Sequence, residues 1–143
     1  MTREASLPSL LRLRTDALFS GLPDGVLARL LGALDEVQVG PGEALYRHGE
    51  PASFLYLLEE GTLDLLTPTG RPIELKERRC GEEAAVTSSY ACSAIARTDL
   101  RVLRLPKSAL TEVAKANPAF AASATQALLS SIGGESFLLP GKA

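Results

Sequence analysis

The sequence has few of the residues on which metal sites and covalent catalysis depend. Among 143 residues there are two cysteines, Cys80 and Cys92, and one histidine, His48. Two cysteines are too few for a disulfide framework, and with one histidine they do not make a plausible zinc set. A catalytic nucleophile would have to pair with His48, which lies in a turn-like segment. The sequence therefore predicts small buried thiols, no metal, no catalytic residue and no enzymatic activity.

Concentrated positive charge and long apolar runs are lacking as well. The chain has 15 Lys and Arg against 17 Asp and Glu, a net charge of -2, and an isoelectric point near 5.5. This balance argues against the basic face that nucleic-acid binding needs. No apolar run approaches the roughly 20 residues that span a bilayer, and residues 1–6 lack the apolar region of a signal peptide. We expect a cytoplasmic protein with no direct nucleic-acid binding and no membrane insertion.

What is present is a change of hydrophobic period along the chain. Residues 7–35 have apolar residues at helical spacing, with one clear helix beginning at Pro23-Asp24. Residues 36–106 alternate with period two, in short apolar segments separated by glycine and proline turns at intervals of roughly 8–12 residues. Residues 107–132 return to helical spacing. These periods predict an N-terminal helical part, a β region and two C-terminal helices.

The predicted fold is therefore mainly β with flanking helices. The strand spacing is typical of a β jelly roll, or double-stranded β-helix. We expect residues 1–143 to form one domain, in which the C-terminal helices are separated at Asn117-Pro118 and residues 133–143 form a tail.

One stretch inside the β region, from Arg79 to Ile95, is rich in small residues. Small side chains let a ligand approach backbone N–H groups, and several such groups together can bind an anion. The alternative is a connecting loop that binds nothing.

Three further segments carry a resemblance to a known family: Leu18 to Leu22 before a leucine-rich helix, Gly42 to Ala52 with glycines at its corners, and Phe54 to Gly61. From about Ala17 to Ile132 the sequence resembles the cyclic nucleotide-binding domain family. That family is the sensor of catabolite-activator-type regulators, protein kinase A regulatory subunits and cyclic-nucleotide-gated channels.

The resemblance implies that the small-residue stretch is a phosphate-binding cassette. Gly81-Glu82 matches the family's glycine–acid pair and Ala84 its small residue, so Glu82 would accept a hydrogen bond from the ribose 2′-hydroxyl. Ser93 falls near the Ser or Thr that faces the cyclic phosphate. The predicted ligand-binding residues are Gly81, Glu82, Glu83, Ala84, Tyr90, Ala91, Cys92 and Ser93.

The sequence departs from the cassette pattern at two places. Tyr90 or Ala91, depending on a one-residue gap, stands where the family has an arginine that pairs with the phosphate. Losing that contact should cost on the order of 2–5 kcal/mol. Tyr90 could stack on a base, although filling the vacated space is favoured. Glu83 stands where relatives have an apolar residue; it would repel an anion if it faced the pocket, but an orientation toward solvent is favoured.

These features lead to two functional hypotheses. The first is a regulatory sensor domain in signal transduction, whose binding of cAMP or cGMP is weak, altered or lost because the arginine is missing. The second is a ligand-free structural or interaction module that dimerises or docks on an effector domain. The expected partners are a cyclic nucleotide, an effector domain or partner protein, and a second copy of the chain through the C-terminal helices. Asn117-Pro118 is the candidate hinge.

Overall fold

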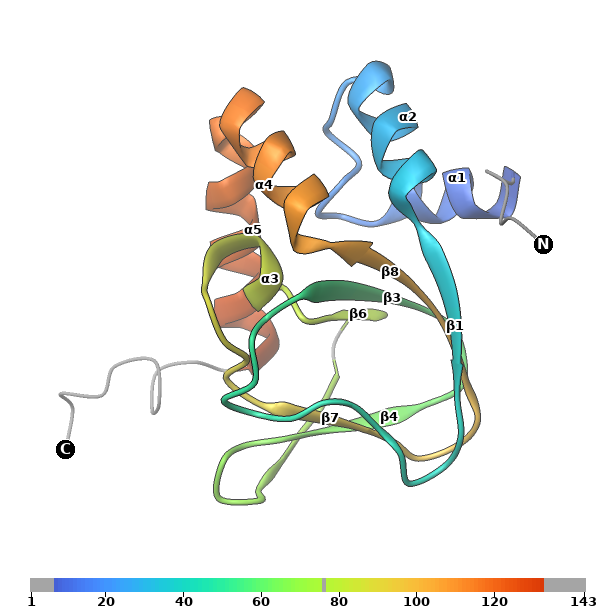
Figure 1. Ribbon diagram of the computed structural model, residues 1–143, viewed down its shortest axis with the longest axis vertical. Helices are drawn as coiled ribbons and strands as arrows, with labels where there is room; N and C mark the ends of the chain where they lie inside the picture. Colours follow the sequence, from blue (N-terminus) through green and yellow to red (C-terminus); the bar gives the residue numbers. More distant parts are fainter. Residues whose placement is uncertain (1–6, 76, 133–143) are drawn as a thin grey trace, which may run out of the picture.

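The computed structural model describes residues 7–75 and 77–132 (Figure 1). Helices lie near both ends of this described part, and the strands lie between them. The helices are α1 (Leu7–Thr15), α2 (Asp24–Ala33), α3 (Glu83–Val86), α4 (Lys107–Ala116) and α5 (Pro118–Ile132). The strands are β1 (Asp35–Val39), β2 (Ala44–Tyr46), β3 (Phe54–Glu60), β4 (Leu63–Leu66), β5 (Pro72–Ile73), β6 (Arg79–Cys80), β7 (Ser93–Ala96) and β8 (Leu100–Pro106). The predicted tail, residues 133–143, lies outside the described residues.

The strands form two four-stranded antiparallel sheets. One has the order β1-β8-β3-β6 and the other the order β2-β7-β4-β5. Strands far apart in sequence are neighbours in both sheets, as expected of a jelly roll rather than of successive hairpins. The predicted fold class, a mainly β jelly roll with flanking helices, is confirmed.

The central strand β3 explains why one segment of the sequence is continuously apolar. Leu55, Tyr56, Leu57 and Leu58 are all buried, although alternate side chains of a strand point to opposite faces. Helices contact the sheet around β3, because α3 packs on β3 while α2 and α4 pack on its neighbour β8. Because the side chains on both faces of β3 are buried, neither face is exposed to solvent. Its sequence therefore lacks the usual alternation of apolar and polar residues.

The C-terminal helices separate where the sequence predicts. α4 ends at Ala116 and α5 begins at Pro118, since proline is tolerated in a first helical turn. Phe120, Ala124 and Leu128 form the buried face of α5, and this helix packs along α3 (Figure 1). The N-terminal half of α5 is thereby fixed to the core, while its later turns lie against the segment that contains α3.

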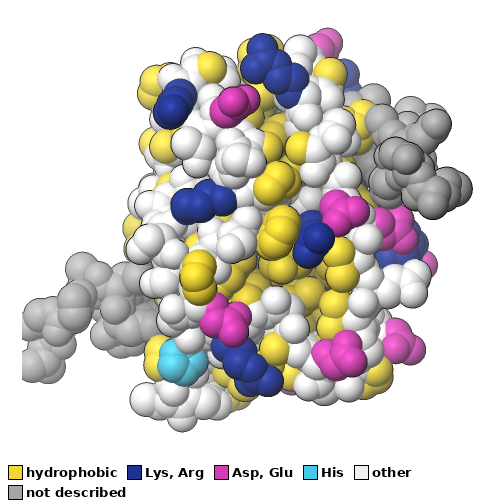
Figure 2. All heavy atoms as spheres, in the orientation of Figure 1, with side chains coloured by type: hydrophobic (Ala, Val, Ile, Leu, Met, Phe, Trp, Pro, Cys, Tyr) yellow, Lys and Arg dark blue, Asp and Glu magenta, His cyan; other side chains and the backbone are white. Residues whose placement is uncertain are grey.

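The surface carries charges of both signs. On the face drawn in Figure 2, basic and acidic side chains are interspersed with apolar ones. Among the helices of the described residues, none has the length and apolar character needed to cross a membrane.

Candidate functional site

The predicted cassette begins at Gly81, directly after the short strand β6 ends at Cys80. This glycine has a φ of 82°, a conformation that side-chain-bearing residues rarely adopt. A Cβ atom there would lie 2.8 Å from the carbonyl oxygen of Phe54. Only glycine therefore lets the chain turn this closely beside β3 and enter α3, the single helical turn of the cassette.

Glu82, the predicted ribose acceptor, is bonded to an internal cation. Its side chain is buried, and its Oε2 accepts a hydrogen bond from Nε of Arg79 at 3.0 Å. The same guanidinium donates to Oδ1 of Asp16 through its other arm. Each of the three side chains is almost fully buried. Charges in such an environment must be paired, so this group links the connection before α2 to the cassette.

Glu83 points into the molecule and not to solvent. The favoured orientation toward solvent was wrong, because the side chain is only 2% exposed. Its Oε2 accepts a hydrogen bond from the backbone N–H of Ala91 at 2.8 Å. Burial raises the pKa of the Glu83 carboxyl to about 7, with a smaller contribution from the neighbouring Glu82, while backbone donors including those of Ala91 and Cys92 act in the opposite direction. A carboxyl group thus lies inside the predicted cassette.

Tyr90 fills interior space, as favoured from the sequence. Its hydroxyl donates to the carbonyl oxygen of Phe54 at 2.6 Å and accepts from the N–H of the same residue at 3.0 Å. Its ring stacks on Tyr46 with 3.8 Å between centroids and 13° between planes. Burial raises the pKa of the Tyr90 hydroxyl. The side chain is therefore held at its hydroxyl and at its ring, and it brings no positive charge to this position.

The remaining cassette residues close the segment. Oγ of Ser93 accepts a hydrogen bond from the backbone N–H of His48 at 3.0 Å, so the hydroxyl is directed toward the turn after β2. Cys92 is buried against Leu128 of α5, and burial raises the pKa of its thiol to about 12. Both cysteines are buried and unpaired with each other, as predicted. Helix α5 thereby covers the cassette at Cys92.

The structure brings the eight predicted residues into one continuous region. All of them are buried except Ala91, which is half-buried. This region is therefore packed with the chain's own side chains. Whether these residues bind a ligand stays a prediction.

Sequence reasoning missed four residues that hold the cassette in place. They are Asp16, Tyr46, Lys107 and Leu128, which come from segments outside it. Lys107 is the first residue of α4, and its ammonium donates to two carbonyl oxygens at the end of α3, at 3.0 and 2.6 Å. The local sequence, in which Pro106 precedes Lys107, indicates only that a helix begins there. It does not show which groups the Lys107 ammonium would contact.

No group of three or more His, Cys, Asp or Glu side chains that could hold a metal occurs within residues 7–75 and 77–132. The acids of the cassette are instead bonded to an arginine and to the backbone.

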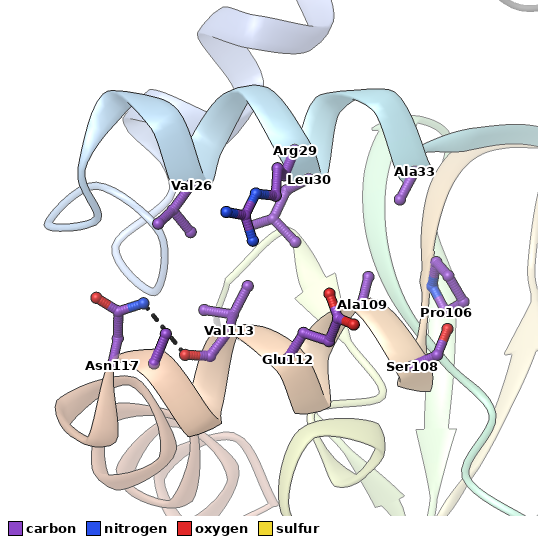
Figure 3. A pocket seen from close by; sticks show the side chains of 11 residues that line it. Val26, Arg29, Leu30, Ala33, Pro106, Ser108, Ala109, Glu112, Val113 and Asn117 are labelled. Carbon is purple, nitrogen blue, oxygen red and sulfur yellow. Dashed lines mark hydrogen bonds between the residues drawn. The ribbon is translucent and has the colours of Figure 1, made fainter.

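A second concave region lies away from the cassette. It is a groove of about 340 Å³ between α2 and α4 (Figure 3). Val26 and Leu30 of α2 face Val113 of α4, and Arg29 and Glu112 extend into the space from opposite helices. The groove is therefore apolar at its base, with one charge of each sign available to a partner.

The chain is similar in sequence to regulatory and transport proteins. The family described as cyclic nucleotide-binding domain matches residues 36–117. A protein of Rhodopseudomonas palustris described as a potassium channel protein is 37% identical over 93 residues, which cover 60% of this chain and 23% of that protein. The chain thus spans less than a quarter of this relative's length.

Solved structures share the fold. The sensor domain of the transcriptional regulator DNR from Pseudomonas aeruginosa is 27% identical, with a TM-score of 0.70, over 85% of this chain and 90% of that chain. The regulatory subunit of a cAMP-independent protein kinase A from Trypanosoma brucei is 21% identical, with a TM-score of 0.62, over 76% of this chain and 44% of that chain.

A triply substituted form of the Trypanosoma brucei subunit, in which one substitution replaces threonine by arginine, is bound to cAMP. It is 22% identical to this chain, with a TM-score of 0.59, over 75% of this chain and 44% of that chain. The family match extends from β1 to the end of α4 and includes the whole cassette. This chain belongs to the cyclic nucleotide-binding domain family.

Proposed function

We propose that the chain is a non-enzymatic regulatory sensor domain in which binding of cAMP or cGMP is weak, altered or lost. The observation that carries the proposal is Tyr90, which is hydrogen-bonded at its hydroxyl and stacked on its ring. Tyr90 or Ala91, depending on a one-residue gap, stands where the resemblance to the family places a phosphate-binding arginine. The absent contact corresponds to about 2–5 kcal/mol, or to a loss of affinity of roughly 30-fold to several thousand-fold.

Two nearby cations, Arg79 and Lys107, are held by other groups of the chain. The guanidinium of Arg79 is bonded to Asp16 and Glu82. The ammonium of Lys107 is bonded to backbone carbonyls at the end of α3. Recruiting either cation to a phosphate would break these bonds, and in the case of Arg79 it would take a cation away from two buried carboxylates.

The relatives support both the regulatory role and the weak, altered or lost nucleotide binding. They are described as a channel, a transcriptional regulator and a kinase regulatory subunit, which supports control of an effector domain. The kinase subunit is described as cAMP-independent, and a form of it that gains an arginine is bound to cAMP. This pair supports the importance of the missing arginine here. The buried free thiols of Cys80 and Cys92 support the predicted cytoplasmic location, where thiols stay reduced.

The contact between α5 and the cassette supports a route for the signal. Leu128 is buried on Cys92, and the break between α4 and α5 lies at Asn117-Pro118. A change in the cassette would alter the surface on which α5 rests, and the break would let this helix reorient.

Calorimetric titration of the chain with cAMP and with cGMP tests the proposal. We expect no heat at micromolar nucleotide and a dissociation constant of about a millimolar or weaker. A low-micromolar dissociation constant for either nucleotide would refute it. Ala91→Arg restores a cation at the half-buried position and should tighten binding, whereas Ala91→Met, of similar length and without charge, should not.

A ligand-free docking module is the second candidate. It is favoured by the groove between α2 and α4 and by Leu129 of α5, which is 45% exposed. Sedimentation velocity decides whether the partner is a second copy: a dimer that Leu129→Glu dissociates would support self-association through the C-terminal helices. If the chain is a monomer at every concentration, self-association is ruled out, and docking on an effector domain remains as the second candidate function.

A further inference from the structure

The carboxyl group of Glu83 lies where an anion would otherwise contact the cassette. It is 2% exposed, and it is held by the backbone N–H of Ala91 at 2.8 Å. Ala91 is one of the two residues at the place of the family's arginine, so the donor taken by Glu83 lies at the centre of the predicted phosphate site. An internal oxygen anion and an external phosphate would need the same donor.

We propose that Glu83 is an internal occupant of the phosphate subsite and that it selects against anionic ligands. The inference rests on the proposed function and deepens it, because it names the residue that opposes nucleotide binding in addition to the missing arginine. A cyclic phosphate could bind only after displacing the Glu83 carboxylate from the N–H of Ala91. The negatively charged phosphate would then lie close to the displaced, negatively charged carboxylate.

The charged groups around Glu83 are of both signs. Glu82, which directly precedes α3, adds negative charge next to it, and its cationic neighbour Arg79 is shared with Asp16. Two further cations are Lys107 of α4, whose ammonium is bonded to the carbonyl oxygens of Ala84 and Thr87, and Arg71, which acts on the thiol of Cys92. The neighbouring hydroxyls and thiols belong to Tyr46 on β2, Cys80 on β6, and Tyr90 and Cys92 before β7. Burial raises the pKa of each of these hydroxyls and thiols, so they remain neutral near pH 7. Helix α5 contributes the apolar Leu128.

Protonation of Glu83 would therefore weaken the barrier to an anion. Burial raises the pKa of Glu83 to about 7, so the carboxyl is mainly neutral at pH 6 and mainly charged at pH 8. The phosphodiester of cAMP keeps its charge across this range. Affinity for cAMP should accordingly rise as the pH falls.

The test measures cAMP and sulfate binding at pH 6 and pH 8 by amide chemical shifts of the ¹⁵N-labelled chain. Glu83→Gln keeps an oxygen acceptor for Ala91 and removes the charge. We expect this variant to bind cAMP at pH 8 about tenfold more tightly than the unsubstituted chain, and to lose the pH dependence. Glu77→Gln, at an exposed position before the cassette, makes the same change in net charge and should leave affinity unchanged.

Equal affinity of Glu83→Gln and the unsubstituted chain at pH 8 would overturn the inference and leave the proposed function intact. Low-micromolar binding by the unsubstituted chain at pH 8 would instead refute the proposed function, while the ratio between the two proteins would still judge the inference. If Glu83→Gln does not fold, the unsubstituted chain decides: tighter cAMP binding at pH 6 than at pH 8 supports the inference, and pH-independent affinity overturns it. Sulfate, which has no ribose, reports whether the effect belongs to the anion subsite.

Discussion

The buried Glu83 carboxyl should make the stability of the protein depend on pH. Its pKa is about 7 in the folded chain, against 4.5 for an ordinary glutamate. Between these values the folded state binds more protons than the unfolded state, so stability falls as the pH rises. Below about pH 4.5 the group adds no penalty, and above about pH 7 the penalty is complete.

The magnitude follows from the size of the shift. At about 1.36 kcal/mol for each pKa unit, the penalty at pH 8 is roughly 3 kcal/mol. Because the side chain is 2% exposed, solvent screening reduces this value little. Glu83→Gln removes the titrating group. The free energy of unfolding of the variant minus that of the unsubstituted chain should therefore increase by this amount between pH 4.5 and pH 8.

Urea unfolding followed by circular dichroism at pH 5, 6, 7 and 8 measures the difference. Other groups titrate in both proteins, so the difference between their free energies of unfolding isolates Glu83. The exposed Glu77→Gln serves as the matched control and should follow the unsubstituted chain at each pH. A difference that stays constant within about 0.5 kcal/mol from pH 5 to pH 8 would refute the buried, titrating carboxyl.

Three further substitutions, two of them paired with a control substitution, test the structure through urea unfolding. Tyr90→Phe removes a hydroxyl that makes two backbone hydrogen bonds and should cost about 1–3 kcal/mol; a loss under about 0.5 kcal/mol would contradict its place in the core. Gly61→Ala would place a Cβ atom 2.1 Å from a backbone oxygen at a φ of 96° and should cost more than about 3 kcal/mol. Gly70→Ala has a similar φ and open space around it and should cost only about 1 kcal/mol, so equal costs would contradict the packing at Gly61. Arg79→Ala removes a buried cation shared by two buried carboxylates, of which Asp16 keeps its ion pair with Arg12, and should cost about 3–5 kcal/mol, against less than about 1 kcal/mol for Arg97→Ala in an exposed ion pair; similar losses would contradict the buried network.

The elements of the fold could be predicted from local pattern. The apolar run of Phe54–Glu60, the alternation of Leu100–Pro106 and the break before Pro118 each mark an element that the structure contains. Such signals are readable because side-chain period and backbone dihedral preferences act within a few residues. The pairing of the strands is different, since β1 pairs with β8 and β3 with β6, and the local pattern does not name these partners.

The cassette was predicted from its glycine, acid and small residues, but the internal contacts of this segment were not. Glu83 has a polar side chain, and exposure is the usual state of such a residue. Its burial depends on which side of a single helical turn faces the sheets, and a helix of four residues carries too little periodicity to show this. The ion pair between Arg79 and Asp16 joins positions 63 residues apart, and only the folded chain brings them together.

The sequence by itself determined the helix and strand segments and the absence of an arginine at Tyr90 and Ala91, and it predicted a cassette from Gly81 to Ser93, because these depend on residue type and spacing. Only the tertiary structure decided what takes the arginine's place. Tyr90 packs on Tyr46 and bonds to β3, and Glu83 turns inward to the N–H of Ala91. The physical reason is that a buried polar group must find a partner, and which partner is within reach depends on how distant segments pack.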